Sequence, residues 1–393
     1  MLNIHNYYLS ENLYQGTRTL VYRGQRICDK KQVIIKVLRN PHPSFNELVQ
    51  FRNQYIITRH LEHPAIIQPL ALERYGNSYA LVMPDSGAIA LFEYWQNLEQ
   101  SLSNFLKIAM QLAEALHYLG IQRIIHKDIK PANILIHPES KQIQLIDFSI
   151  STLLPKEQQQ LISPNVLEGS LGYISPEQTG RMNRGIDYRT DFYSLGVTFF
   201  ELLTGQLPFK SSDPMELVHC HIAKTPPNPP NSQVPTPLVD IVRKLMAKNV
   251  EDRYQNALGL KHDLEQCLQQ LKATGKIRQF ELGSRDLCDR FLIPEKLYGR
   301  ETEVQKLLDA FERVSNPPET SLGSNPPLTP LGSNPPLTPL GSNPPLTPLG
   351  KGGDGCSEMM LVAGFSGIGK TAVINEVHKP IVRQRGYFIK GKY

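Results

Sequence analysis

The spacing of apolar residues along the first 272 residues of the chain changes from strand-like to helix-like. Residues 33–38 and 79–83 are short apolar runs with β-branched side chains, which predict two strands. From 105 to 119 apolar residues recur every three or four positions, as in an amphipathic helix, and 191–204 and 256–271 continue this pattern. This order predicts an α+β fold in which a small β-rich part precedes a larger helical part.

The rest of the chain contains a repeat between two shorter patterned segments. Residues 273–296 are polar, 301–314 have the periodicity of one amphipathic helix, and 359–363 are typical of a buried strand. Between them the nonapeptide LGSNPPLTP occurs three times in succession, beginning at Leu322. The repeats have no charged or aromatic residue, and proline interrupts helices and sheet ladders, so we expect a disordered or polyproline-like segment.

These patterns divide the chain into five parts. We expect a first domain at 8–272, a linker at 273–296, the start of a second module at 297–315, the disordered repeats at 316–353, and the rest of the second module at 354–393.

Composition and charge argue against several classes of protein. Apolar residues make up 40% and charged residues 20%, and no apolar stretch approaches the roughly 18 residues of a membrane span. The N-terminus lacks the features of a signal peptide, so we expect a cytoplasmic protein. The net charge of +5 is spread without basic blocks, which argues against nucleic acid as a partner. The five cysteines include no C-x-x-C pair, so we expect reduced thiols.

Two short polar motifs contain the residue types that phosphoryl transfer requires. HKDIKPAN at 126–133 follows the predicted helix at 105–119, and DFS at 147–149 follows an apolar run. Phosphoryl transfer needs a carboxylate that orients the hydroxyl nucleophile, cations near the phosphates, and oxygen ligands for magnesium.

Each of these needs has a candidate residue in the chain. Asp128 can orient the hydroxyl, and Lys130 can neutralise the γ-phosphate. Asn133 and Asp147 can hold magnesium against the phosphate oxygens, and Lys36, in the predicted strand at 33–38, can contact the α and β phosphates.

Together with four further motifs, this set resembles the eukaryotic-type protein kinase family. The further motifs are VIIK at 33–36, SPE at 175–177, DFYSLG at 191–196 and EDR at 251–253. The six landmarks follow the family's order and spacing. The resemblance implies the two-lobed kinase fold, with a β-rich N-lobe and an α-helical C-lobe, and it implies ATP and Mg²⁺ as cofactors.

The resemblance also implies roles for individual residues. Asp128 would be the catalytic base, Asn133 and Asp147 the metal ligands, and Lys36 the residue that clamps the phosphates. The pairing of Lys130 with Ser170, in GSLGY at 169–173, is similar to the serine/threonine branch of the family.

Outside the catalytic motifs, the resemblance implies an ion pair and an ATP pocket. Glu177 and Arg253 are expected to form a buried pair with a structural role. The residues expected around ATP are Leu13, Gly16, Val21, Lys36, Gln54, Met83 and Asp85.

The sequence departs from the family pattern near the phosphates. Only the middle glycine of the phosphate-covering loop, Gly16, remains, so we expect a stiffer loop. Gln54 stands where the family has a glutamate that pairs with the strand lysine. Gln54 can still hydrogen-bond Lys36, at a loss of about 1 kcal/mol. Glu47, seven residues earlier, is an alternative partner.

Two more departures affect regulation. Ser149 replaces the glycine after the magnesium aspartate, so we expect this loop to switch less. Lys127 stands where many kinases carry an arginine that binds a phosphorylated activation loop, which argues against that form of regulation.

A second phosphate-binding motif lies near the C-terminal end. GFSGIGKT at 364–371 fits the P-loop pattern G-x-x-x-x-G-K-[ST], after a predicted strand and before a segment with helical character. Its defining residues are Gly364, Gly369, Lys370 and Thr371. This region resembles the start of the ATPase module that follows the kinase domain in large bacterial signalling kinases. We expect an incomplete module that does not hydrolyse nucleotide, because too few residues follow to supply a Walker B acid.

The sequence therefore predicts a serine/threonine protein kinase of bacterial signal transduction. Its substrates would be protein hydroxyls, and its partners would include downstream signalling proteins. The alternatives are a pseudokinase or scaffold that binds ATP without transferring phosphate, and a remnant of a larger sensor kinase.

Overall fold

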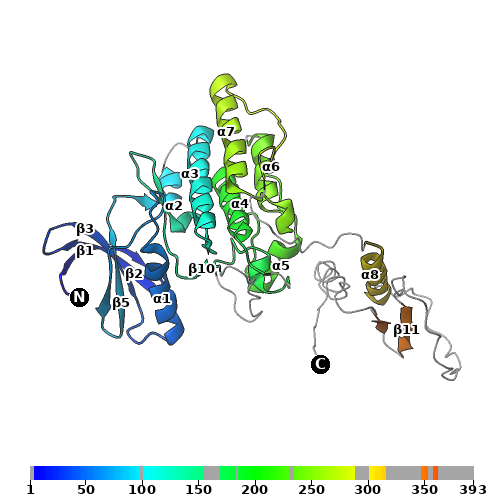
Figure 1. Ribbon diagram of the computed structural model, residues 1–393, viewed down its shortest axis with the longest axis horizontal. Helices are drawn as coiled ribbons and strands as arrows, with labels where there is room; N and C mark the ends of the chain where they lie inside the picture. The colour runs from blue at the N-terminus through cyan, green and yellow to red at the C-terminus, as the bar shows by residue number, and fades with distance from the viewer. Residues whose placement is uncertain are drawn as a thin grey trace. The chain divides into compact units, whose positions relative to one another are not determined.

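A computed structural model describes residues 4–97, 101–154, 169–182, 185–229, 234–287, 301–315, 347–352 and 357–361. The chain divides into two compact units, Met1–Phe291 and Leu292–Tyr393. We describe each unit by itself. In the first unit, strands gather at one end and helices at the other (Figure 1).

The N-lobe of the first unit is an antiparallel sheet with the strand order β1-β2-β3-β5-β4. Its strands are β1 (Tyr7–Gln15), β2 (Thr19–Arg26), β3 (Gln32–Leu38), β4 (Ala71–Tyr75) and β5 (Ser78–Pro84). Strands β3 and β5 confirm the two strands predicted from the apolar runs. Alternate residues of these strands, such as Val33, Ile35 and Val82, pack in a small core on one face. Lys36 therefore faces the other side of the sheet.

Helix α1 (Phe45–Thr58) is the helix of the N-lobe. Its N-terminus is closed by a capping box, in which the side chain of Ser44 and that of Glu47 each bond the other residue's backbone N–H. Phe51 and Gln54 are buried on its inner face. The cap fixes where the helix begins, and the helix start fixes which residues point inward.

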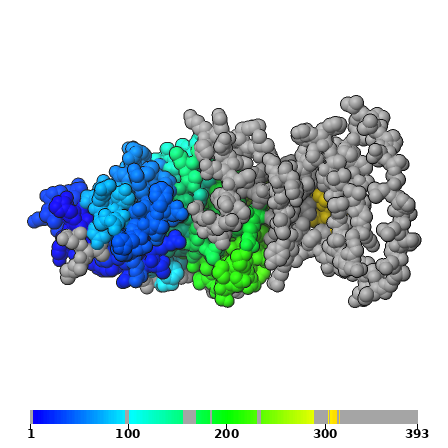
Figure 2. Space-filling view, turned by 90° about the horizontal axis from the view of Figure 1, so that it is seen from below, coloured from blue at the N-terminus to red at the C-terminus, as the bar shows by residue number. Residues whose placement is uncertain are grey.

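The C-lobe is mainly helical. Its helices are α2 (Leu91–Asn97), α3 (Leu102–Ile121), α4 (Arg189–Thr204), α5 (Pro214–Ala223), α6 (Thr236–Leu245) and α7 (Ala257–Thr274). Helices α3, α4 and α7 confirm the three predicted helical segments. The apolar positions of α3 are buried in one large core with residues of α4, α6 and α7. In Figure 2 the N-terminal residues, in blue, and the residues of α4 and α5, in green, lie toward opposite ends of this unit.

Short elements of the C-lobe flank the two polar motifs. These are β6 (Ile89–Ala90), β7 (Ile124–Ile125), β8 (Ile134–Ile136), β9 (Ile143–Leu145), β10 (Thr152–Leu153) and the 3₁₀ helices η1 (Pro131–Asn133), η2 (Glu177–Thr179) and η3 (Val250–Asp252). Strand β8 pairs with β6 and β9, and β7 pairs with β10. Residues 126–133 begin directly after β7, and residues 147–149 lie between β9 and β10.

The start of the predicted linker is part of the folded C-lobe. Helix α7 ends at Thr274, and residues 276–287, which we call the C-terminal strap, follow it. Ile277, Phe280 and Leu282 of the strap pack against the large core. The prediction of a linker from 273 onward is therefore wrong for these residues, because three apolar side chains in a polar stretch are sufficient to anchor it.

The second unit contains one helix and two strands among its described residues. Helix α8 (Glu301–Ser315) confirms the amphipathic helix predicted at 301–314, and it lies against β12. Strands β11 (Thr347–Gly352) and β12 (Ser357–Leu361) pair in antiparallel fashion.

Strand β11 corrects the prediction that 316–353 lack ordered structure. It begins within the last copy of the repeat. Pro348 is its only proline, so the other residues of the strand keep the N–H groups that a ladder needs. The P-loop residues Gly364, Gly369, Lys370 and Thr371 lie outside the described residues.

Two expectations about the chain as a whole can be compared with the described residues. Among them, no helix has both the length and the apolar character that a membrane span requires. Cys28, Cys220 and Cys267 are free thiols.

Candidate active site

Lys36 lies where a strand, a helix and a loop of the N-lobe and C-lobe meet. Its Nζ is 3.0 Å from Asp147 Oδ1 and donates a hydrogen bond of 2.9 Å to Gln54 Oε1. Lys36 and Gln54 are both buried. The predicted bond between Gln54 and Lys36 is therefore present. The alternative partner, Glu47, is instead committed to the helix cap, where it accepts hydrogen bonds from Ser44 N and Oγ.

Asp147 has a backbone conformation that side chains rarely adopt. Its φ is 64°, in the left-handed region, and such strain is typical of functional sites. Burial raises the pKa of its carboxyl group, but the Lys36 charge and hydrogen bonds from Lys36 and Ser149 outweigh burial, and the pKa lies below its usual value. Asp147 is therefore ionised at neutral pH.

Asp128 is fixed by three neighbours. Lys130 Nζ and Asn133 Nδ2 each donate to Asp128 Oδ2 at 2.8 Å, and Ser170 N donates to Oδ1 at 3.0 Å. Lys130 Nζ also donates to Ser170 Oγ at 2.5 Å. The carboxylate thus has a fixed orientation, with a cation beside it.

Asp191 on α4 holds the loop that contains Asp128. Its two carboxylate oxygens accept hydrogen bonds from His126 N at 2.7 Å and Lys127 N at 2.8 Å. Burial raises the pKa of Asp191, and these bonds and the charges of His126 and Lys127 counteract burial. Lys127 itself has a φ of 67°. The motif at 191–196 pointed to this residue, but the sequence alone did not reveal its role.

Several predicted ATP residues share the face of the sheet that bears Lys36. Val21 is directly opposite Lys36 in the β2–β3 pair, and Met83 is opposite Ile34 in the β3–β5 pair. Directly opposed residues project to the same face, as do residues two apart. Val21, Lys36 and Met83 therefore line one surface.

The remaining predicted ATP residues differ from one another in their environment. Gly16 lies between β1 and β2, where an added Cβ would be 2.6 Å from Cε1 of the exposed Tyr14 ring, so a larger residue here would displace that ring. Leu13 lies at a bulge of β1 and is 40% exposed.

Asp85 bonds its neighbours at the end of β5. Its carboxylate accepts hydrogen bonds from Arg23 Nε at 2.7 Å and Gly87 N at 2.9 Å, and its own N–H donates to Gln32 O. These bonds fix the chain directly after β5, and the role of Asp85 around ATP stays a prediction.

The arrangement of Asp147 and Asn133 fits magnesium bound jointly by protein and phosphate. Ile146 N donates to Asn133 O at 3.0 Å. This bond brings Asp147, the residue after Ile146, close to Asn133. Asn133 uses Nδ2 for Asp128, so its amide oxygen is the remaining ligand atom, and the buried Asp147 Oδ1 lies 3.0 Å from the Lys36 ammonium group. Among the described residues no cluster of three His, Cys, Asp or Glu side chains could hold a metal alone. Mg²⁺ is typically bound by one or two carboxylates together with substrate phosphates.

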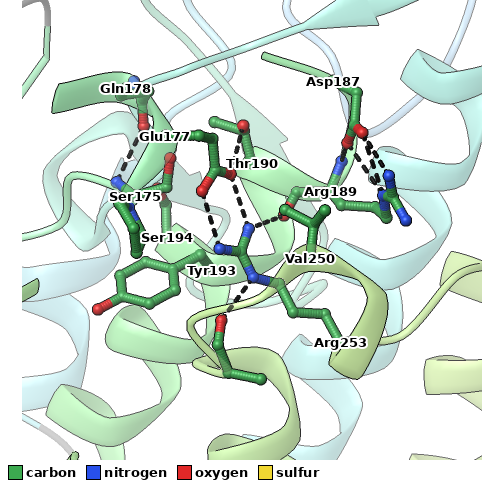
Figure 3. Close-up of polar contacts among 12 residues, drawn as sticks. Ser175, Glu177, Gln178, Asp187, Arg189, Thr190, Tyr193, Ser194, Val250 and Arg253 are labelled. Atoms are coloured by element: carbon green, nitrogen blue, oxygen red, sulfur yellow. Dashed lines mark hydrogen bonds and ion pairs between the residues drawn. The ribbon is translucent and has the colours of Figure 1, made fainter. Parts of the chain in front are cut away.

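The predicted ion pair between Glu177 and Arg253 is present in the C-lobe (Figure 3). Arg253 donates two parallel hydrogen bonds to the carboxylate, at 2.7 and 2.8 Å, and both side chains are almost completely buried. Thr190 donates to the same carboxylate. Burial acts to raise the pKa of Glu177, but the Arg253 charge prevails and holds the pKa below its usual value.

Comparison with known proteins gives a family match and several relatives. A family model described as protein kinase domain matches residues 7–268. The chain is 31% identical to the hybrid signal transduction histidine kinase G of Dictyostelium discoideum, over 79% of this chain and 10% of that protein. It is 32% identical to the serine/threonine-protein kinase PrkC of Bacillus subtilis, over 64% of this chain and 38% of that protein. The serine/threonine-protein kinase PknB of Mycolicibacterium smegmatis is 29% identical, over 66% and 42%. The chain thus spans less than half the length of these relatives.

Proposed function

The chain belongs to the protein kinase family, and we propose that it transfers the γ-phosphate of ATP to serine or threonine hydroxyls of proteins. The observation that carries this proposal is the set of contacts that joins Lys36 to Asp147 and Asp128 to Lys130, Asn133 and Ser170. The similarity to serine/threonine-protein kinases supports the same class of acceptor.

Asp128 would act as the catalytic base. Its carboxylate can accept the proton of the substrate hydroxyl as the oxygen attacks phosphorus, and Lys130 beside it would stabilise negative charge on the transferred group. The bonds from Asn133 and Ser170 keep the carboxylate in one orientation, so no reorganisation is needed during the reaction.

Lys36, Asn133 and Asp147 would bind the phosphates. Lys36 would contact the α and β phosphate oxygens from the sheet, and Asn133 and Asp147 would hold Mg²⁺, which neutralises charge on the phosphates when bound. Gly16, Val21 and Met83 would surround the nucleotide on the N-lobe side. Gln54 would orient Lys36 through a neutral hydrogen bond.

The pseudokinase and remnant alternatives have less support than catalysis. Gln54, one of the departures from the family pattern, accepts a hydrogen bond from Lys36 and so keeps this lysine in place. One relative's description as a signal transduction kinase favours a signalling role with downstream protein partners. The P-loop motif at 364–371 supports a second phosphate-binding segment on sequence grounds alone.

Transfer of labelled phosphate from ATP-Mg to a generic basic protein tests the proposal on the full chain. Asp128→Asn should lower the rate by about 10²- to 10⁴-fold and keep ATP binding, because it removes the base but not the phosphate ligands. Lys36→Met should weaken both ATP binding and transfer. Circular dichroism should be unchanged in both variants.

The outcomes separate the alternatives. A wild-type chain that binds ATP-Mg but transfers no phosphate would be a pseudokinase, and the proposal would be wrong. Full activity in Asp128→Asn would mean that another residue is the base.

A further inference from the structure

Asn53 connects helix α1 to the loop that follows Asp147. Its Nδ2 donates to the carbonyl oxygens of Ser151 at 2.8 Å and Ser149 at 3.1 Å, and lies 3.4 Å from that of Phe148. An amide nitrogen has two hydrogens, so the two shorter contacts use both of them and the third is shared. The donor and its acceptors are about a hundred residues apart in the sequence but in contact in the fold.

The bonds of Asn53 lie next to the hydrogen bond between Gln54 and Lys36, which is weaker than a charged pair would be. Asn53 directly precedes Gln54, whose neutral amide holds Lys36. A neutral acceptor binds an ammonium group less strongly than a carboxylate would, so the link between α1 and β3 is weaker than a charged pair. Asn53 supplies a second attachment of the same helical turn, directed at the other partner of Lys36, the loop of Asp147.

Among the described residues of the first unit, no element covers the apolar side chains on the outer face of α1. Phe45, Val49 and Ile56 on that face are 79%, 49% and 46% exposed. The position of the helix therefore depends on its inward contacts. Ser149, whose carbonyl Asn53 binds, follows Asp147 by two residues in the chain. The bond from Asn53 thus holds the backbone of the loop directly after Asp147.

We propose that Asn53 is a positioning residue for phosphoryl transfer, which holds α1 and the loop at 148–151 together so that Lys36 and Asp147 remain in contact. This inference rests on the proposed kinase function. Asn53 does not touch the reacting atoms; it acts through the backbone of the loop at 148–151 on Asp147 and, through the position of α1, on Lys36.

The test compares two variants of Asn53 in the full chain, one that removes the amide donor and one that keeps it. Asn53→Asp keeps the size of the side chain but replaces the donor with an acceptor that faces carbonyl oxygens. Asn53→Gln keeps an amide donor. We expect Asn53→Asp to lower kcat about 10-fold or more and to raise the Mg²⁺ concentration needed for half-maximal rate, and Asn53→Gln to retain more activity than Asn53→Asp. Asn46, exposed on the same helix, provides the matched control Asn46→Asp, which should change neither quantity.

A second substitution distinguishes positioning from folding. Gln54→Glu restores a charged link between α1 and Lys36, so we expect Gln54→Glu to recover part of the kcat lost in Asn53→Asp. Amide hydrogen exchange should rise in the loop at 148–151 of Asn53→Asp but not of Asn46→Asp.

Three further outcomes would each overturn the positioning role of Asn53. If the wild-type chain transfers phosphate and Asn53→Asp matches it in kcat and Mg²⁺ dependence, the positioning role is wrong and the kinase function stands. A loss of kcat that follows a lowered Tm and is not recovered by Gln54→Glu would make Asn53 merely structural. If the wild-type chain transfers no phosphate, the function fails and the positioning role with it.

Discussion

Arg253 and Glu177 form a buried salt bridge, and substitution of either residue should destabilise the fold. Both side chains are withdrawn from water, so removal of one charge leaves the other buried and uncompensated, at a cost of roughly 3–5 kcal/mol. Arg253 also donates to the backbone carbonyl of Arg189, and the pair has no contact with Asp128 or Asp147 among the bonds described, so its effect is on folding rather than on the chemical step.

Glu177→Gln should reveal this pair through the pH dependence of stability. The pKa of Glu177 is lowered in the folded protein from an ordinary value of 4.5, so the ionised form contributes its full stability above pH 4.5. This contribution is lost as the pH falls below 4.5 toward the lower folded value. In urea unfolding, the difference in free energy of unfolding between the wild type and Glu177→Gln should therefore be constant from pH 8 to 5. This difference should become smaller below pH 4.5. Glu281→Gln, at an exposed residue, is the control. A stability difference between the wild type and Glu177→Gln that does not depend on pH would argue against the ion pair as its cause.

The site residues differ in how far the sequence could predict them. Lys36, Asp128, Asn133 and Asp147 stand in short motifs whose spacing reflects their chemistry, so the sequence was sufficient to nominate them. Asn53 and Asp191 bind backbone groups of distant segments. Every residue has a carbonyl and nearly every one an N–H, so no pattern of side chains marks such partners in advance. The bonds that Asp85 makes could not be predicted for a related reason, since its partners Arg23 and Gln32 lie on other strands of the sheet.

Among the elements, α7 shows how a segment far along the chain can complete a helix terminus. Its first backbone N–H groups lack partners within the helix, and the Asp286 carboxylate accepts hydrogen bonds from Gln255 N and Asn256 N just before it. Lys244 of α6 forms an ion pair with the same carboxylate. At Gly259 an added Cβ would lie 2.7 Å from Asp286 Cα, so glycine permits this close approach. The C-terminal strap is thus part of how α7 is held.

Asp286→Ala should destabilise the first unit. The substitution removes the acceptor for two backbone N–H groups and leaves Lys244 without this partner, for which we expect a loss of about 1–2 kcal/mol. Urea unfolding monitored by circular dichroism measures the change. The matched control is Glu281→Ala, an exposed residue of the same strap. Equal stability of Asp286→Ala and the control would show that the strap is dispensable.

Elements with strong periodicity were predictable, whereas those that depend on remote partners were not. Helix α3 buries the same apolar positions that the spacing indicated, because one amphipathic face suffices to specify a helix against a core. The strap has little periodicity, and its order comes from anchors at Ile277, Phe280 and Asp286. Strand β11 likewise depends on its partner β12, and no local pattern in the repeat predicts this pairing.

For the molecule as a whole, the division into two units places all proposed catalytic residues in the first one. Six motifs in family order were enough to predict the two-lobed architecture, because they resemble the protein kinase family, whose fold has two lobes. The boundary was harder to predict: the sequence suggested 272, but the first compact unit extends to Phe291.

A chain of residues 1–291 should transfer phosphate at the rate of the full chain and unfold at the same urea concentration. The first unit contains its own core, the strap and every residue assigned to the reaction. Lys370→Ala in the full chain should leave the KM for ATP of phosphate transfer unchanged, because Lys370 belongs to a different unit. A lowered transition midpoint for 1–291, or a raised KM in Lys370→Ala, would show that the units are functionally dependent.

Asn53 binds main-chain oxygens, and this has a consequence for how the protein can vary. A carbonyl is present whatever the side chain, so the acceptor residues Phe148, Ser149 and Ser151 can be exchanged without removing the acceptor atoms. The donor has no such freedom, since few side chains of this length present two N–H hydrogens. Mutational tolerance in this contact is therefore unequal: its hydrogen bonds do not restrict which side chains the loop carries, whereas they require an amide at position 53.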